Sequence, residues 1–186
     1  DTADVLTFVA DDSNNILVLT ATVTEVRYQA NGGPVIPLAN ALSSTLRQVV
    51  VQGGTGHDRI DLSGMGATLV EMARVGGGAI VTGGAGNDTI RGTAFNDEID
   101  GGSGSDELSG EAGDDILRAR DFESDLLQGG TGHDSAYFES SDTVSTVEVY
   151  NPFTPAADNQ VQKLKVLVLN FDPLIPSQNN QHLYEL

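Results

Sequence analysis

The sequence contains no cysteine and no tryptophan, and it has few basic residues. Nine Lys and Arg stand against 27 Asp and Glu, which gives a formal net charge of −18. The lack of cysteine excludes a disulfide framework. A chain this acidic is not expected to bind nucleic acid or an anionic membrane by electrostatic attraction. No apolar run reaches the ~18 residues of a membrane span, so we expect no such span.

Catalytic and targeting motifs are also missing. The sequence has neither the H-E-x-x-H motif of zinc peptidases nor the G-x-S-x-G motif of serine hydrolases. The Gly-rich segments lack the Lys of a phosphate-binding loop. We therefore expect no enzyme activity, with an all-β enzyme whose site lies in the flanks as a minor alternative. No signal peptide is visible and the first residue is Asp, so we expect a processed, excised or incompletely recorded chain.

Glycine, in contrast, is abundant and regularly placed. The motif G-G-x-G-x-D occurs at residues 53–58, 83–88, 101–106 and 129–134. From residue 83 the pattern repeats every nine residues, with one extra residue in the segment 119–128. A short fixed period is typical of a stacked repeat architecture. At 186 residues, the chain is expected to form one domain.

Each repeat divides into a turn and a short strand. The first six positions are Gly-rich, and glycine allows the positive φ values of tight turns. The last three positions form a minimal strand whose middle residue faces inward, since side chains alternate between faces. The expected inward residues are Ile90, Ile99, Leu108, Leu117, Leu127 and Ala136. Two repeats would form one coil, and coils would stack at ~4.8 Å, the spacing of neighbouring strands.

This stacking brings carboxylates together. Asp88 precedes Asp106 by 18 residues, and Asp97 precedes Asp115 by 18. Since one coil has 18 residues, these like charges would be stacked neighbours along each edge of the solenoid. A hard divalent cation between neighbouring loops would reverse this repulsion. Calcium accepts carboxylate and carbonyl oxygens in irregular geometry, whereas magnesium requires a stricter octahedron. Zinc prefers His and Cys ligands, and the sequence has no Cys. Among these metals calcium therefore fits best, and the sequence predicts several bound calcium ions.

The repeats resemble the repeats-in-toxin family, also called hemolysin-type calcium-binding repeats. The resemblance covers residues 83–137 and the outlying segment 53–61. It implies that loops of repeats n and n+2 hold calcium through the aspartate at position six and the carbonyls of the Gly-rich turn. The implied carboxylate ligands are Asp58, Asp88, Asp97, Asp106, Asp115, Asp125 and Asp134. The implied turn glycines are Gly53, Gly54, Gly56, Gly83, Gly84, Gly86, Gly101, Gly102, Gly104, Gly110, Gly113, Gly129, Gly130 and Gly132.

Three loops depart from the pattern. Thr93 and Phe95 replace glycines at positions two and four, Glu111 stands at position two of a later repeat, and residues 119–124 contain no glycine. We expect the sites in these loops to be weaker, empty or differently built, with Asp121 and Glu123 as candidate ligands. His57 and His133, at position five, are expected to be exposed spacers.

The fold class that we predict is all-β: a calcium-binding parallel β-roll or β-solenoid with β-rich flanks that lack the repeat. Residues 1–52 are expected to form wider coils or a small antiparallel cap, residues 53–139 the calcium-binding roll, and residues 140–186 a strand-containing flank and tail. Strands are expected at residues 5–10, 16–20, 23–29, 35–38, 47–51, 59–63, 68–72, 79–82, 143–150 and 161–170, with a short helix at 39–46 and a tight turn at Asn31 and Gly32.

Two functions remain open. The first is a non-catalytic, secreted or cell-surface calcium-binding structural or adhesive protein, which could assemble with copies of itself into filaments or a surface layer through its terminal strands. The second is a calcium-dependent secretion and folding module of a larger secreted enzyme, such as a protease or lipase. Extracellular calcium modules bind at about 10⁻⁴–10⁻³ M, which favours a location outside the cell.

Overall fold

The computed structural model describes residues 4–22, 25–38, 46–66, 69 and 76–152. These residues form strands, turns and loops, and they contain no helix. Consequently, none of them forms a helix that could cross a membrane. The predicted helix at 39–46 lies outside the described residues except for Leu46, which begins a strand. The predicted strand at 161–170 also lies outside them, as does most of that at 68–72.

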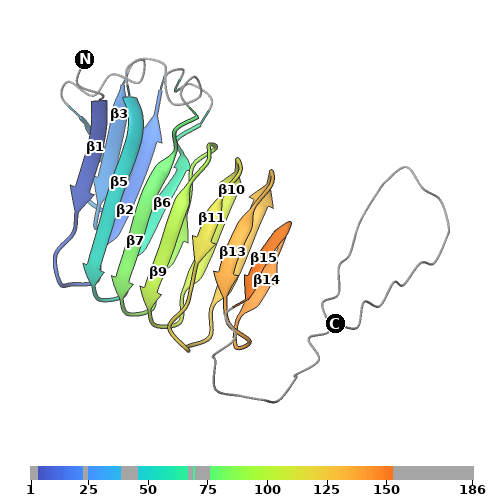
Figure 1. Ribbon diagram of the computed structural model, residues 1–186. Coiled ribbons are helices and arrows are strands. Elements are labelled where there is room, and N and C mark those ends of the chain that lie inside the picture. The colour runs from blue at the N-terminus through green and yellow to red at the C-terminus, as the bar shows by residue number, and fades with distance from the viewer. Residues whose placement is uncertain (1–3, 23–24, 39–45, 67–68, 70–75, 153–186) are drawn as a thin grey trace, which may run out of the picture. The chain divides into compact units, whose positions relative to one another are not determined.

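The described strands form two sheets, and from β5 onward successive strands alternate between them (Figure 1). One sheet runs in the order β1 (Asp4–Val9), β5 (Leu46–Thr55), β7 (Ala79–Ala85), β9 (Glu98–Ser103), β11 (Ile116–Arg118), β13 (Ser135–Phe138) and β15 (Val149–Pro152). The other runs β14 (Thr143–Ser145), β12 (Leu126–Thr131), β10 (Glu107–Ala112), β8 (Thr89–Arg91), β6 (Arg59–Gly64), β2 (Ile16–Ala21), β3 (Val26–Ala30) and β4 (Ile36–Pro37). All pairings except β2–β3 and β3–β4 are parallel. This all-β, mostly parallel arrangement is consistent with the predicted β-roll.

The strand register follows the repeat period. Ile90 pairs with Leu108, 18 residues later, and Leu108 pairs with Leu127, 19 residues later because of the extra residue. Ile60 pairs with Ile90. The coil that contains the segment between the first two G-G-x-G-x-D motifs is therefore 30 residues long instead of 18, which makes it an enlarged coil.

The core is a column of aliphatic side chains between the two sheets. The predicted inward residues Ile90, Ile99, Leu108, Leu117, Leu127 and Ala136 all have 0% exposure, which confirms their assignment. Burying a side chain of this size stabilises a fold by roughly 1.5–3 kcal/mol. The column extends toward the N-terminus through Val49, Val51 and Leu19.

The first strands differ from the repeats in that β2, β3 and β4 form an antiparallel unit. Asn31 and Gly32 adopt φ values of 49° and 68° in the turn after β3, where the sequence predicts a tight turn. Beyond the last repeat, the single strand predicted at 143–150 is wrong. The structure has two short strands there, β14 and β15, which belong to different sheets. A bend at Thr146, with φ of 50°, separates them.

Candidate metal centre

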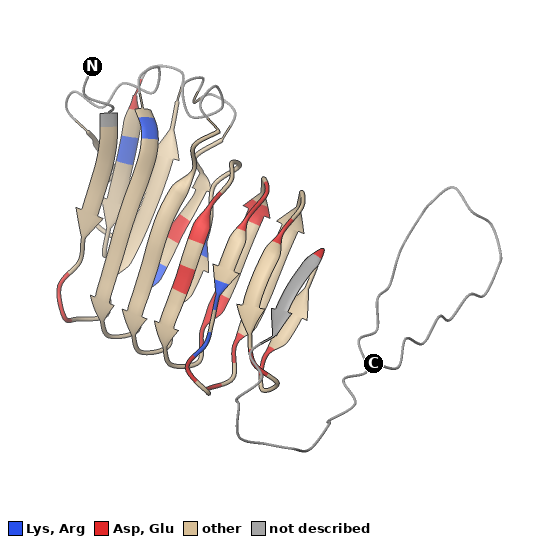
Figure 2. Cartoon of the chain, in the orientation of Figure 1, with Lys and Arg blue, Asp and Glu red and all other residues tan. Residues whose placement is uncertain are grey.

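The aspartates at position six are buried although they lie in turns. Asp58, Asp88, Asp97, Asp106, Asp115, Asp125 and Asp134 are each at most 4% exposed. Each one directly precedes a strand of the two sheets, so the register of the strands fixes its position. Acidic residues recur through the repeat region, whereas Lys and Arg are few (Figure 2).

These aspartates form two hydrogen-bonded ladders, one along each edge of the stacked turns. In both, the Oδ1 atom of one aspartate accepts the backbone N–H of the equivalent residue one coil earlier. The N–H of Asp88 donates to Asp106 at 2.8 Å, and that of Asp106 donates to Asp125 at 2.7 Å. The first ladder comprises Asn15, Asp58, Asp88, Asp106, Asp125 and Asp142. The second comprises Ala79, Asp97, Asp115, Asp134 and Glu148.

The last acids of the two ladders were missed by the sequence analysis. Asp142 Oδ1 accepts the N–H of Asp125 at 3.2 Å, and Glu148 Oε2 accepts that of Asp134 at 2.8 Å. Both lie outside the nonapeptide pattern, at spacings of 17 and 14 residues from their partners. The available signal was positional, because Asp142 directly precedes the strand β14 as the other aspartates precede theirs.

The second oxygen of most of these aspartates has no hydrogen-bond partner. Six buried Oδ2 atoms lack a donor among the described residues, those of Asp58, Asp88, Asp106, Asp115, Asp125 and Asp134. A buried carboxylate oxygen without a donor is costly unless a cation or a proton compensates it. This is the strongest indication in the structure that the loops hold a positive ligand.

In the loops that begin with glycine, this first residue leaves room for the oxygen. A Cβ at Gly83 would overlap both Asp88 Oδ2 and the carbonyl oxygen of Gly101 in the next loop. A Cβ at Gly110 would similarly overlap Asp115 Oδ2 and the carbonyl oxygen of Gly129. A carboxylate oxygen and a carbonyl oxygen of the next coil therefore lie on the same side of the turn, and both are oxygen donors suited to a hard cation.

Asp97 differs from the other position-six aspartates. Thr93 donates its N–H to Asp97 Oδ2 at 2.5 Å and its hydroxyl to Asp97 Oδ1 at 2.8 Å. Both carboxylate oxygens are thus satisfied by protein donors. The expectation that this loop departs from the others is confirmed, and the cause is the side chain and backbone of Thr93.

Backbone conformation separates the departing loops further. Gly102 and Gly104, at positions two and four, have φ of 100° and 122°. Glu111 at position two and Phe122 at position four keep positive φ, at 75° and 72°, although neither is glycine. Such a conformation costs a non-glycine residue about 1–2 kcal/mol. Thr93 and Phe95 do not adopt it.

Burial raises the pKa of six of the position-six aspartates, which are Asp88, Asp97, Asp106, Asp115, Asp125 and Asp134. Desolvation raises the pKa of Asp106 and of Asp115 to about 7, with a further contribution from neighbouring aspartates. Desolvation also raises the pKa of Asp97 and of Asp125 to about 6. For Asp97 the hydrogen bonds from Ala79 and Thr93 lower the pKa and oppose this effect. The folded chain therefore disfavours the ionised form of these groups in the absence of a cation.

The remaining candidate residues are not brought into the ladders. His57 and His133 are exposed, as predicted, but His57 is more than a spacer, since its Nδ1 accepts the N–H of Asn87 at 2.7 Å. Asp121 accepts the N–H groups of Gly104 and Glu123. Glu123 itself is exposed.

The donor set fits calcium better than a metal held by side chains alone. No three His, Asp or Glu side chains within the described ranges could together hold a metal ion. Any ion in these loops would therefore need backbone carbonyls or water beside one or two carboxylates. Calcium readily accepts such a set of oxygens.

A comparison with protein-family models finds four copies of the RTX calcium-binding nonapeptide repeat at residues 82–117. This segment includes β8, β9, β10 and the first two residues of β11, together with the aspartates from Asp88 to Asp115. No curated protein and no solved structure matches the chain.

Proposed function

We propose, from the RTX calcium-binding nonapeptide repeats that this chain carries, that the protein is a non-catalytic extracellular structural element whose fold is completed by calcium. In this proposal the two sheets wind as one continuous parallel β-roll. The observation that carries the proposal is the set of six buried aspartate Oδ2 atoms for which the described residues offer no donor. RTX repeats bind calcium, and a calcium ion beside these oxygens would compensate their buried charge.

The charge of the chain supports a dependence on cations. Each calcium ion adds two positive charges to a chain of formal net charge −18. When only the folded state has the binding sites, binding free energy becomes folding free energy. A site of Kd ~10⁻⁴ M at 10 mM calcium would contribute about 2.7 kcal/mol.

The same chemistry supports an extracellular location. RTX repeat proteins are typically secreted, and loops that bind at about 10⁻⁴–10⁻³ M would be filled outside the cell. The proposed role is non-catalytic because the buried acids hydrogen-bond one another's backbone in ladders, and no catalytic motif is present in the sequence.

Self-association is a second part of the proposal. β1 and β15 are the outer strands of one sheet, and no described strand pairs with their free edges. β1 also presents Val5 and Val9 at 46% and 70% exposure. Unpaired edges can add a strand from another copy, and a contact that does not close generates a filament.

Analytical ultracentrifugation of the protein with 10 mM calcium and with chelator tests both parts. We expect a compact species with calcium, an expanded one without it, and larger assemblies at high protein concentration with calcium. An equal frictional ratio in the two conditions would refute calcium-dependent folding. A compact monomer at every concentration would refute self-association alone.

A further inference from the structure

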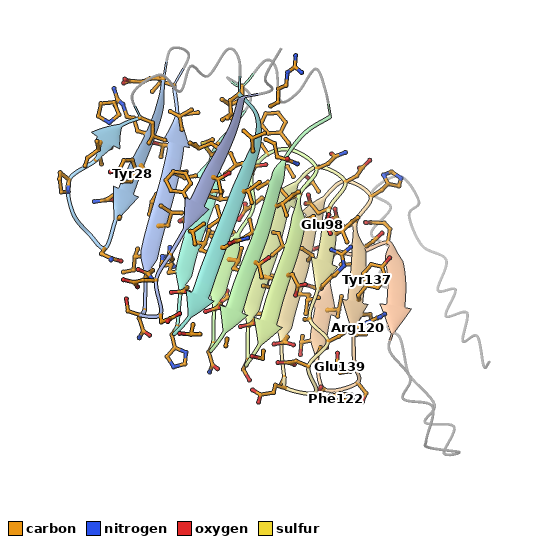
Figure 3. The ribbon with its side chains drawn as sticks, turned by 60° about the vertical axis from the view of Figure 1, so that its left-hand side comes forward. Tyr28, Glu98, Arg120, Phe122, Tyr137 and Glu139 are labelled. Atoms are coloured by element: carbon orange, nitrogen blue, oxygen red, sulfur yellow. The ribbon has the colours of Figure 1, made fainter. Side chains whose placement is uncertain are left out.

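A second group of acids lies beyond the segment that matches the nonapeptide repeats. It consists of Asp121, Asp125, Glu139 and Asp142, which we call the terminal acid cluster. Asp121 and Asp125 come from the glycine-free loop between β11 and β12, and the other two from the turn between β13 and β14. Figure 3 shows Glu139 and Phe122 close together at this end of the stacked turns.

Hydrogen bonds hold the cluster in place. Asp142 Oδ2 accepts the N–H of Glu139 at 2.7 Å, while its Oδ1 accepts that of Asp125 at 3.2 Å. Glu139 Oε1 accepts the N–H of Phe122 at 2.7 Å. The two loops are therefore tied together through carboxylates instead of through the glycine turns of the repeats.

Glu139 is the unusual member of this cluster. Glu139 is 5% exposed, and its Oε2 atom is buried without a hydrogen-bond donor from any residue that the structure describes. Asp125 Oδ2, in the same cluster, is also buried and accepts no hydrogen bond within the described part of the chain. A glutamate can be buried in this way when a cation compensates its charge.

Electrostatics point in the same direction. Burial raises the pKa of Glu139, and Asp142 and Asp121 raise it further, whereas Arg120 lowers it. Burial also raises the pKa of Asp125, and the charges of Asp142, Asp121 and Glu139 raise it further. Several carboxylates thus repel one another in this cluster. The guanidinium of Arg120 lies 4.9 Å from the centre of the Tyr137 ring.

We propose that Glu139 anchors a divalent-cation site of its own at the terminal acid cluster, separate in composition from the glycine-loop sites. Calcium is the cation that fits, because the oxygens available to bind it, Glu139 Oε2 and Asp125 Oδ2, are carboxylate oxygens. The cluster does not bring three acidic side chains to one point, so Glu139 and one further acid, with backbone or water oxygens, form the site. Its function is to fix the end of the roll, where the nonapeptide pattern stops.

The test counts bound calcium by isothermal titration calorimetry at neutral pH in wild type, Glu139→Gln and Glu107→Gln. Glu139→Gln keeps the side-chain shape and removes the charge, whereas Glu107 is exposed on β10 and provides the matched control. We expect Glu139→Gln to bind one ion fewer, or to bind one ion at least ~10-fold more weakly, and Glu107→Gln to match wild type. Identical titrations for Glu139→Gln and wild type would show that Glu139 holds a proton instead, and would overturn the site.

Two further variants keep the test decisive. Asp88→Asn reports on the glycine-loop sites, so a loss of ions in Asp88→Asn without any change in Glu139→Gln would refute the terminal site and leave the proposed function standing. If wild type binds no calcium, the proposed function itself fails. If Glu139→Gln does not fold, Glu139→Asp is compared with Glu107→Asp. The shortened carboxylate should weaken one ion at least ~10-fold, and an unchanged affinity would overturn the proposal.

Discussion

The loop that ends in Asp97 and the loop that ends in Asp106 each bury a carboxylate, but they differ in the hydrogen-bond donors that they offer to it. Both aspartates are buried, and both accept an N–H from the preceding level of their ladder. In the first loop Thr93 donates to both carboxylate oxygens. In the second loop Gly102 stands at the equivalent position, and Asp106 Oδ2 has no donor among residues 4–22, 25–38, 46–66, 69 and 76–152.

This difference separates the stabilisation that the chain provides from the stabilisation that a cation must provide. At Asp97 the backbone N–H of Thr93, a residue without positive φ, satisfies Oδ2, and its hydroxyl adds a further donor to Oδ1. A glycine with positive φ at the same position turns its backbone so that the carboxylate oxygen remains open. The glycines at position two of the repeat therefore have two effects. They permit the tight turn, and their positive φ directs backbone N–H groups away from the carboxylate oxygen.

The largest expected effect is that of removing calcium altogether. At neutral pH, a chelator should abolish most of the β-sheet signal in far-UV circular dichroism, because six buried carboxylate oxygens then lack any compensation. Millimolar calcium should restore the signal and raise Tm. Magnesium at the same concentration is the control, and we expect it to be a poor substitute. Superimposable melting curves in chelator and in calcium would contradict this prediction.

The next effect compares the two loops directly. Asp106→Asn should raise the calcium concentration needed for folding at least ~10-fold, equivalent to ~1.4 kcal/mol, because it removes the charge of an open carboxylate. Asp97→Asn should instead place an amide group against the donors of Thr93 and cost about 1–3 kcal/mol at every calcium concentration.

Calcium titrations of both variants, followed by circular dichroism, distinguish these outcomes. A shifted midpoint is expected for Asp106→Asn, and a loss of stability that excess calcium does not restore is expected for Asp97→Asn. Equal midpoint shifts in the two variants would mean that Thr93 does not replace a cation.

The sequence was sufficient for the features that depend on periodicity. Ile90, Leu108 and Leu127 were placed in the core from the nine-residue repeat, and the register confirms them. Burial of the position-six aspartates also follows from that period. The aspartates lie at fixed distances from the inward residues, so stacking one set also stacks the other.

The features that the sequence did not reveal depend on contacts between segments of irregular length. Asp142 and Glu139 lie in a shortened loop, and their roles arise from distant partners, Asp125 and Phe122. The strand predicted at residues 143–150 splits because Thr146 adopts a left-handed conformation, which alternating polarity does not indicate. Thr93 was recognised as a departure, but its hydrogen bonds to Asp97 required the structure.

A smaller effect is expected from converting one loop type into the other. Thr93→Gly removes the hydroxyl donor to Asp97 and permits positive φ, so it should cost about 1–2 kcal/mol of calcium-independent stability. Asp97 should then become more dependent on calcium. Differential scanning calorimetry in chelator and in calcium measures both changes, with Ala94→Gly, an exposed position of the same loop, as the control. Equal losses in Thr93→Gly and Ala94→Gly at all calcium concentrations would argue against the conversion.

The last expected effect is that of protons, which can compensate the same carboxylates in the absence of calcium. Burial raises the pKa of Asp106 and of Asp115 to about 7 in the folded chain, against ~3.9 when unfolded. The folded state therefore binds more protons than the unfolded state between about pH 4 and pH 7, so stability in chelator should rise as pH falls through this window.

We expect the β-sheet signal in chelator to be partly regained at pH 5 relative to pH 8. The gain should be smaller than that from calcium, because a protonated carboxyl donates to one oxygen whereas calcium binds several. Asp106→Asn should respond less to pH than wild type. A signal in chelator that falls steadily from pH 8 to pH 5 would show that the buried aspartates do not oppose the calcium-free fold.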